Sequence, residues 1–231
     1  MLILSILFIT LLILISHRWW RRAPIRRWYK ALNLDRHYIT FQQLYQDIDG
    51  FLLSRQARAK HDAIEYTYGE IDFISFSALL SLAHPDSNTI FYDLGSGTGK
   101  AVLTAAMVFN AQKSTGIELF NSLHHASLHQ KQRLQQLPEY QAKASIIHFI
   151  HGDYLLADFS DATMIFIDAT ALFGETWRAL NQHLQQMSVG TKVITTSKKL
   201  FSNAFVVKQT TTVKMSWGVV HAYIHQRTHE M

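Results

Sequence analysis

Residues 93–100 have the residue types and spacing that most clearly predict chemistry in this chain. They lie between an apolar run at 89–92, which predicts a buried strand, and an apolar pattern at 101–109, which predicts a helix. Asp93 is followed by a glycine at every second position, namely Gly95, Gly97 and Gly99. Glycine lets the backbone turn sharply and approach a ligand without an intervening Cβ atom, and the first amides of the next helix are free to bind an anionic group. The segment therefore predicts a binding site for a nucleotide-type cofactor.

Two common phosphate-binding loops do not fit this spacing. A P-loop requires a glycine five residues before its Gly-Lys pair and a serine or threonine after it, but Leu94 and Ala101 occupy those positions. The dinucleotide fingerprint requires its third glycine three residues after the second, where Lys100 stands. An acid followed by three alternate glycines is similar to the first motif of the S-adenosyl-L-methionine-dependent methyltransferases. An ordinary glycine-rich turn between a strand and a helix is the alternative interpretation.

Acidic residues end or follow four successive predicted strands. Strands are predicted at 90–94, 114–118, 145–151, 163–168 and 192–196. Ligands of open parallel sheets bind beyond the carboxyl ends of the strands. At these ends stand Asp93, Glu118, Asp153 and Asp168. A carboxylate at Glu118 can accept both hydroxyls of a ribose, and one at Asp153 can accept an adenine amino group, although any single acid could be an ordinary turn residue.

The order of the predicted elements favours an α/β fold. Helices are predicted at 69–82, 99–110, 122–137 and 175–187, and they alternate with the strands above. This alternation predicts a mostly parallel sheet with helices on both faces. Two β-rich stretches at 204–217 and 219–226 flank Gly218 and predict a closing antiparallel hairpin. The expected architecture is a Rossmann-like methyltransferase sheet with a C-terminal antiparallel hairpin, preceded by a hydrophobic N-terminal helix.

Four segments carry a more specific resemblance, to the non-SET lysine methyltransferases of the disruptor-of-telomeric-silencing family. They are Tyr68-Gly69-Glu70, the glycine loop from Tyr92 to Gly99, Gly152-Asp153-Tyr154-Leu155, and Met215-Ser216-Trp217 with Ala222-Tyr223-Ile224-His225. The resemblance covers roughly residues 65–227. It implies that the pocket for the methionine half of the cofactor is shaped by Asp93, Gly95 and Gly97. It also implies that Glu118 holds the ribose and Asp153 the adenine. The loop that covers the cofactor would carry Tyr68 and Glu70.

At the end of the fourth strand the chain departs from that family. The family carries Asn-Asn-Phe along its lysine channel, whereas this chain has Asp168-Ala169-Thr170. Asp168 would place an anion near a cationic cofactor and a cationic substrate. The two prolines of the enzymes that methylate amino groups of nucleic acids are absent, so a nucleic-acid substrate is not expected. Phe173, Trp217 and Tyr223 are candidate walls of an apolar channel, and each could instead be a core residue.

No metal site is expected. The chain contains no cysteine, which excludes disulfides and thiolate zinc sites. His124, His125 and His129 follow one another on a predicted helix, but no carboxylate completes a set of ligands at fixed spacing. We therefore predict that these histidines form a solvated helix face.

The N-terminal region predicts attachment to a membrane. Residues 2–15 are apolar except for Ser5 and Thr10, and bulky and basic residues follow rather than the small residues of a cleaved signal. Much of the formal net charge of +5 lies in one stretch: Arg18, Arg21, Arg22, Arg26, Arg27 and Lys30. Tryptophans suit the interface and arginines the cytoplasmic side, and anionic lipid head groups suit the basic stretch. A hydrophobic helix packed on the domain or on a partner is the alternative.

The predicted organisation has three parts, and the predicted function follows from them. Residues 1–17 form a membrane anchor helix, residues 18–62 a basic linker and helical lead-in, and residues 63–231 a methyltransferase domain facing the cytoplasm. We expect an S-adenosyl-L-methionine-dependent enzyme that methylates protein lysine, with Asp168, Phe173 and Tyr223 at the reacting end. The alternatives are a small-molecule or lipid methyltransferase at the membrane and a non-catalytic, membrane-tethered module that binds the cofactor.

Overall fold

The computed structural model describes residue 20, residues 22–59 and residues 62–228. The predicted anchor at 1–17 lies outside the described residues. Within the described part of the chain, no helix has both the length and the apolar character needed to cross a membrane.

The described residues form one seven-stranded sheet in the order β3-β2-β1-β4-β5-β7-β6. Neighbouring strands from β3 to β5 are parallel, and β7 pairs antiparallel with both β5 and β6. This arrangement confirms the predicted mostly parallel sheet with a closing hairpin. The strands are β1 (Ile90–Leu94), β2 (Lys113–Glu118), β3 (Ile147–His151), β4 (Met164–Ile167), β5 (Lys192–Thr196), β6 (Phe205–Met215) and β7 (Gly218–Arg227).

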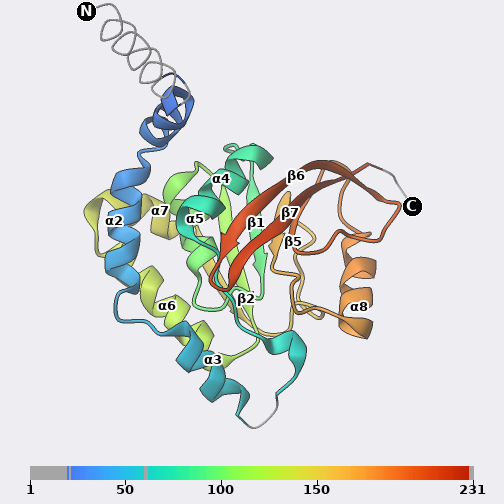
Figure 1. Cartoon of the computed structure of the whole chain (residues 1–231). Helices are drawn as coiled ribbons and strands as arrows, with labels where there is room; N and C mark the ends of the chain where they lie inside the picture. Colours follow the sequence, from blue (N-terminus) through green and yellow to red (C-terminus); the bar gives the residue numbers. More distant parts are fainter. Residues whose placement is uncertain (1–19, 21, 60–61, 229–231) are drawn as a thin grey trace, which may run out of the picture.

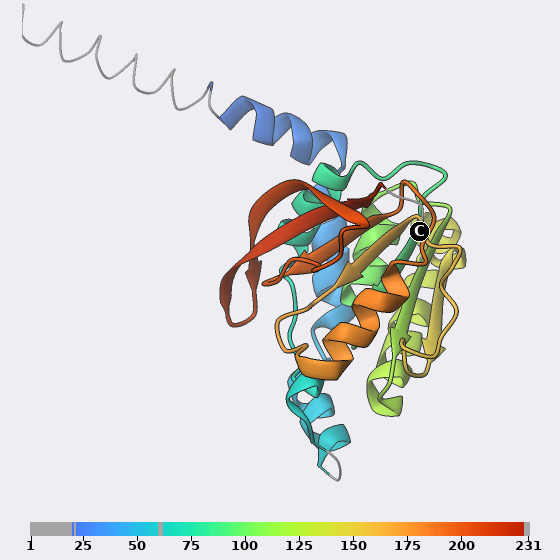
Figure 2. The same ribbon diagram turned by 90° about the vertical axis from the view of Figure 1, so that its right-hand side faces the viewer.

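Helices cover both faces of the sheet and produce two separate cores (Figure 1). One core joins helices α2, α4 and α5 to the sheet, and α8 packs in the other core. Figure 2 shows α8 lying across one face of the sheet and the β6–β7 hairpin extending beyond the other strands. The helices are α2 (Leu34–Tyr45), α3 (Gly50–Arg58), α4 (Phe73–Ala83), α5 (Lys100–Val108), α6 (Asn121–Gln135), α7 (Gln141–Ser145) and α8 (Gly174–Leu184), with short 3-10 turns at Ile64–Tyr66 and Pro138–Tyr140.

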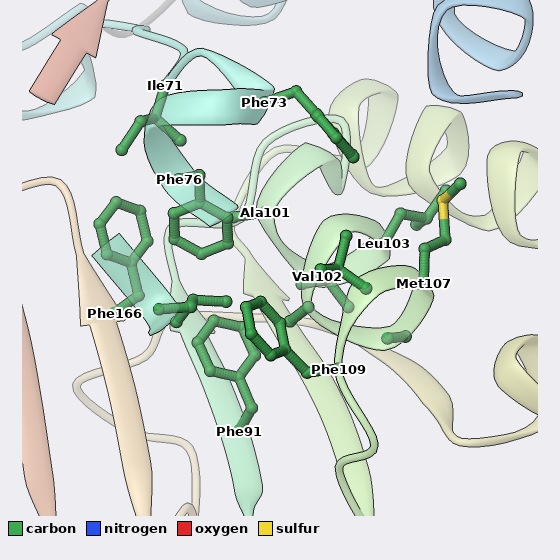
Figure 3. Packing of buried hydrophobic residues seen from close by; sticks show 14 of the residues in the cluster. Ile71, Phe73, Phe76, Phe91, Ala101, Val102, Leu103, Met107, Phe109 and Phe166 are labelled. Carbon is green, nitrogen blue, oxygen red and sulfur yellow. The ribbon is translucent and has the colours of Figure 1, made fainter. Parts of the chain in front are cut away.

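An aromatic cluster fixes α4 to the centre of the sheet. Phe76 of α4 is fully buried, and its ring centroid lies 4.9 Å from that of Phe166 on β4 and 6.2 Å from that of Phe91 on β1 (Figure 3). Edge-to-face packing of this kind adds to the stabilisation that comes from burying apolar area. The segment that precedes α4 is thereby held above the ends of β1 and β4.

The lead-in helix α2 packs on the same core as the sheet. Leu34 and Leu44 are buried in it, and Arg133 of α6 donates to the carbonyl oxygens of Gln43 and Leu44 at 3.0 and 2.6 Å. Part of the predicted linker therefore helps to build the folded domain.

Helix α4 begins later than the pattern at 69–82 predicts. Asp72 is its N-cap, and the side chain of Asp72 accepts a hydrogen bond from the Ser75 amide at 2.9 Å. Before it, Ile71 forms an isolated antiparallel bridge with Met215 of β6. Pairing with the hairpin keeps residues 69–72 out of the helix and makes them a strap beside the sheet, here called the cover segment (residues 67–72).

The strand register brings the predicted acids to one edge. Leu94 of β1 pairs with Ile117 of β2 and with Ile167 of β4. The residues that follow these three positions, Gly95, Glu118 and Asp168, therefore lie at the same edge of the sheet.

Candidate cofactor-binding site

The glycine loop between β1 and α5 is shaped by three left-handed residues. The φ angles of Gly95, Gly97 and Gly99 are +87°, +55° and +84°, a conformation that side-chain-bearing residues adopt only with strain. A Cβ atom on Gly97 would lie 2.7 Å from the ring of Tyr68, whereas a Cβ atom on Gly95 would meet nothing within 4 Å. Gly97 is therefore needed for packing inside the protein, and Gly95 borders open space that a ligand can approach.

Glu118 ties the glycine loop to the neighbouring strand. Its side chain is buried, and its two carboxylate oxygens accept hydrogen bonds from the backbone amides of Gly97 and Phe120, each at 2.8 Å. Burial raises the pKa of Glu118, and the backbone hydrogen bonds oppose that rise. Each carboxylate oxygen can accept a further hydrogen bond, so Glu118 can bind a ligand hydroxyl while it holds the loop.

Two adjoining cavities lie at this edge of the sheet. The larger has a volume of about 180 Å³ and is bordered by Glu118, Asp153 and Leu123, among others. The smaller has a volume of about 40 Å³ and is bordered by Asp93, Gly97 and Lys100, among others. Both are lined by Tyr68, Gly69, Gly95 and Asp168. The predicted cofactor residues Tyr68, Glu70, Asp93, Gly95, Gly97, Glu118 and Asp153 all line one or both cavities, as does Asp168.

Asp93 is a buried acid beside the smaller cavity. The residue is 4% exposed, and none of the described residues donates a hydrogen bond to its carboxylate. Burial and the nearby charges of Glu118 and Asp168 raise the pKa of Asp93 well above its ordinary value. A positively charged ligand group in the smaller cavity would relieve this repulsion.

The cover segment is bonded to the glycine loop. The hydroxyl of Tyr68 donates to Glu70 at 2.8 Å and lies 3.2 Å from the hydroxyl of Thr98. The other carboxylate oxygen of Glu70 pairs with the ammonium of Lys100 at 2.6 Å. Tyr45 of α2 donates to the carbonyl oxygen of Thr98 at 3.1 Å. Lys100 is the one Lys or Arg among the described residues that line the two cavities.

Sequence reasoning did not identify Tyr45, and it assigned no role to Thr98 or Lys100 within the predicted glycine loop segment. The sequence contained one signal for Lys100, because it immediately follows the last glycine of the loop. Nothing in the spacing indicates Tyr45, which reaches the loop from a helix that begins before the first strand.

The hairpin holds the cover segment from the other side. A Cβ atom on Gly69 would lie 1.8 Å from the ring of Trp217, so the indole rests directly on the Gly69 backbone. Next to it, the Ser216 amide donates to the Glu70 carbonyl oxygen at 2.8 Å. Trp217 therefore packs on the cover segment and does not border either cavity.

Two predicted catalytic residues lie away from the cavities. The ring of Phe173 is 52% exposed and lies under the ammonium of Lys198 at 3.3 Å. Tyr223 pairs with Thr195 in the sheet, and the ammonium of Lys199 lies 5.4 Å from its ring. Side chains alternate along a strand; Ala222 and Ile224 fill the core on the α4 side, which turns Tyr223 to the other face.

His124 also differs from the prediction of a solvated face. It is buried, and its ring stacks on His151 with the centroids 5.3 Å apart. Helix α6 lies across the end of β3 and turns this histidine inward. The described residues contain no group of three or more side chains placed to hold a metal ion.

Comparison with protein families gives a match that includes the glycine loop, the sheet and the hairpin. A family model described as histone methylation protein DOT1 matches residues 55–226. A histone-lysine N-methyltransferase specific for lysine 79 of histone H3, from Caenorhabditis elegans, is 29% identical over 147 residues, which are 59% of this chain and 15% of that protein. A protein-lysine N-methyltransferase of Saccharolobus islandicus (strain REY15A) is 30% identical over 87 residues, 38% of this chain and 50% of that protein. The matched segments thus span at most half the length of these curated relatives.

Solved structures show the same architecture. An RNA methyltransferase from Salinibacter ruber, crystallised with S-adenosyl-L-homocysteine, matches with a TM-score of 0.53 and 25% identity. The match covers 68% of this chain and 92% of that one. The Rossmann-like sheet described above is therefore also found in a methyltransferase of known structure.

The raised pKa of Asp93 predicts that this acid destabilises the unliganded protein. An acid whose pKa is higher in the folded state contributes stability below its unfolded pKa and loses it as the pH rises through its folded pKa. The melting temperature of Asp93→Asn should therefore exceed that of the unchanged protein at neutral pH, by about 2–4 °C for each kcal/mol of charge penalty removed. The difference should vanish below the ordinary pKa of 3.8 and grow as the pH rises, which thermal melts between about pH 3 and pH 8 will measure.

Asp161→Asn supplies a control of opposite sign. Burial opposes ionisation of Asp161, but hydrogen bonds with Lys113 and Tyr92 outweigh it and lower the pKa of Asp161. This variant should melt at a lower temperature at neutral pH, and its deficit should shrink as the pH falls. If Asp93→Asn were also less stable at every pH, the electrostatic account of Asp93 would be wrong.

Proposed function

The chain belongs to the family of histone methylation proteins named DOT1, and we propose that it is an S-adenosyl-L-methionine-dependent methyltransferase acting on the side-chain amine of a protein lysine. The family match over residues 55–226 supports the reaction type. The two curated relatives are both named as lysine methyltransferases, which supports the acceptor. The observation that carries the proposal is the pair of adjoining cavities, lined by acids from four strand ends and by residues of the glycine loop.

The described residues fit the cofactor. When bound, S-adenosyl-L-methionine supplies an activated methyl group on a sulfonium. Glu118 and Asp153 border the larger cavity and would accept the ribose hydroxyls and the adenine amino group. Asp93 is a buried carboxyl group whose ionised form would suit the cationic groups at the amino-acid end, and Lys100 is the cation placed to bind the carboxylate. The open space at Gly95 lets the backbone approach the ligand.

The acceptor must be held and must lose a proton. A free lysine side chain has a pKa of about 10.4 and is cationic at neutral pH. Asp168 borders both cavities and would hold the incoming ammonium close to the reacting carbon. Transfer out of water into the site lowers the pKa of an amine, whereas the Asp168 carboxylate favours its charged form, so the proton would leave to solvent before the methyl group is transferred. Fixed positioning would supply most of the remaining rate enhancement.

We also propose that the chain is attached to the cytoplasmic face of a membrane. The apolar residues 2–15 and the basic residues after them support this placement. In the described part, residues 22–31 are helical, and Trp20 and Ile25 expose their apolar side chains beside Arg22 and Arg27. An interfacial aromatic next to basic residues favours contact with anionic lipid.

Cell fractionation tests this attachment. The full chain should sediment with membranes and resist high salt, whereas a variant lacking residues 1–17 should be released by salt, because only charge attraction would remain. Equal recovery of both forms in the soluble fraction would contradict the proposal.

Transfer of a labelled methyl group tests the reaction and the acceptor. Purified protein and tritiated S-adenosyl-L-methionine are incubated with membrane and soluble fractions of cells that lack the protein, and labelled bands are identified by mass spectrometry. Methyl-lysine in a protein band is the expected result. Label confined to lipid or small molecules would contradict the lysine assignment, and no label with any fraction would contradict the enzymatic one.

Replacing Glu118 should weaken cofactor binding. Glu118→Ala removes the acceptor for the ribose and frees the Gly97 amide, and a hydrogen bond to a charged group contributes about 1.5–3 kcal/mol. The affinity for S-adenosyl-L-homocysteine, measured by calorimetry, should fall about 10- to 100-fold. Glu139→Ala, which removes an exposed partner of Arg36, is the control and should bind normally. Unchanged affinity in Glu118→Ala would disprove the ribose assignment.

A further inference from the structure

The carboxylate of Asp168 is held through one of its two oxygens. Oδ1 accepts hydrogen bonds from the Thr196 hydroxyl at 2.5 Å, the Thr170 hydroxyl at 2.7 Å and the Thr170 amide at 3.2 Å. None of the described residues donates to Oδ2. Three donors on one oxygen fix the orientation of the side chain and leave the other oxygen for a group in the cavities that Asp168 borders.

The hydroxyls form a chain with one direction. The Thr170 hydroxyl uses its proton on Asp168, so at its 2.8 Å contact with Ser197 it must accept the proton of the Ser197 hydroxyl. Ser197 is held in a left-handed conformation with a φ of +62°, and its amide donates to the His221 carbonyl oxygen at 2.7 Å. Serine rarely adopts this conformation, and such strain persists where the surrounding structure imposes it.

The position of Asp168 relates this chain of hydroxyls to the reaction. The larger cavity holds the residues suited to adenosine and the smaller those suited to the amino-acid end. Because the sulfur of the cofactor links these two halves, it would lie beside the residues that border both cavities. Asp168 is one of the four residues that line both cavities, which places this residue beside that boundary.

We propose that Thr170, Thr196 and Ser197 are positioning residues that direct the free oxygen of Asp168 toward a cationic amine at the methyl-transfer point. This inference rests on the proposed function and makes its acceptor specific, since the site would select an ammonium group over a neutral amide. It also gives a role to the departure from asparagine at this position. With the same three donors on Oδ1, an asparagine would turn its NH₂ group toward the acceptor and repel a cation.

A pair of cofactor analogues measures the preference of the site for a cationic amine without the natural substrate. S-adenosyl-L-homocysteine has a neutral thioether at the transfer point, and sinefungin has there a carbon that bears an ammonium group. Both are titrated by calorimetry into the full chain. A charge-assisted hydrogen bond to Asp168 should make sinefungin bind about tenfold more tightly or better.

Variants distinguish the positioning of the Asp168 carboxylate from a general effect on the fold. Asp168→Asn should abolish the preference for sinefungin. Thr196→Val, which keeps the shape but removes one donor, and Ser197→Ala, which breaks the hydroxyl chain, should each reduce the preference about threefold or more while leaving the affinity for S-adenosyl-L-homocysteine within about twofold. Thr115→Val is the matched control: Thr115 is fully buried, its hydroxyl has no partner, and it lines neither cavity.

Each outcome decides a different question. A preference for sinefungin that survives in Asp168→Asn, or that Thr196→Val and Ser197→Ala leave intact, overturns the inference. Failure of the unchanged protein to bind either analogue overturns the proposed function instead. If Thr196→Val does not fold, as judged by its thermal melt, Asp168→Asn and Ser197→Ala still decide the matter.

Discussion

The hydrogen bond from the Gly97 amide to the buried carboxylate of Glu118 is the constraint on which the rest of the site depends. It joins the glycine loop after β1 to the end of β2, so the loop cannot change shape without exposing or stranding a buried charge. Tyr68 packs against the same glycine and transmits the loop's position to the cover segment. The glycine-loop side of the cavities is thus set by backbone and carboxylate geometry.

Acidic residues far outnumber basic residues in the site. Among the described residues that line the two cavities, the acids are Glu65, Glu70, Asp93, Glu118, Asp153 and Asp168, and Lys100 is the one Lys or Arg. Such an arrangement repels itself when empty and suits a ligand with two cationic groups and one carboxylate. The same imbalance favours an incoming ammonium over a neutral or anionic acceptor.

The sheet and the acidic half of the site could be predicted because they follow from local patterns. Apolar runs mark the strands, Gly218 marks the hairpin, and parallel strands bring Glu118 and Asp168 to one edge. Contacts between residues far apart in the sequence could not be predicted, such as that of Tyr45 with Thr98. The face that Tyr223 takes could not be predicted for another reason: where both faces of a sheet are covered, residue type does not reveal which face a side chain takes.

The cover segment and the glycine loop are held by residues from distant parts of the chain. Tyr45 contacts the glycine loop from α2, and Trp217 packs on Gly69 from the hairpin. A growing polypeptide that has left the ribosome only as far as β5 would already contain Tyr45 and every predicted cofactor-binding acid, but it would lack Trp217 and the hairpin that hold the cover segment. The pocket should therefore become able to retain a ligand only once β6 and β7 have been synthesised and have paired. Such late, long-range closure is a slow step in folding, so ligand retention would report completion of the fold.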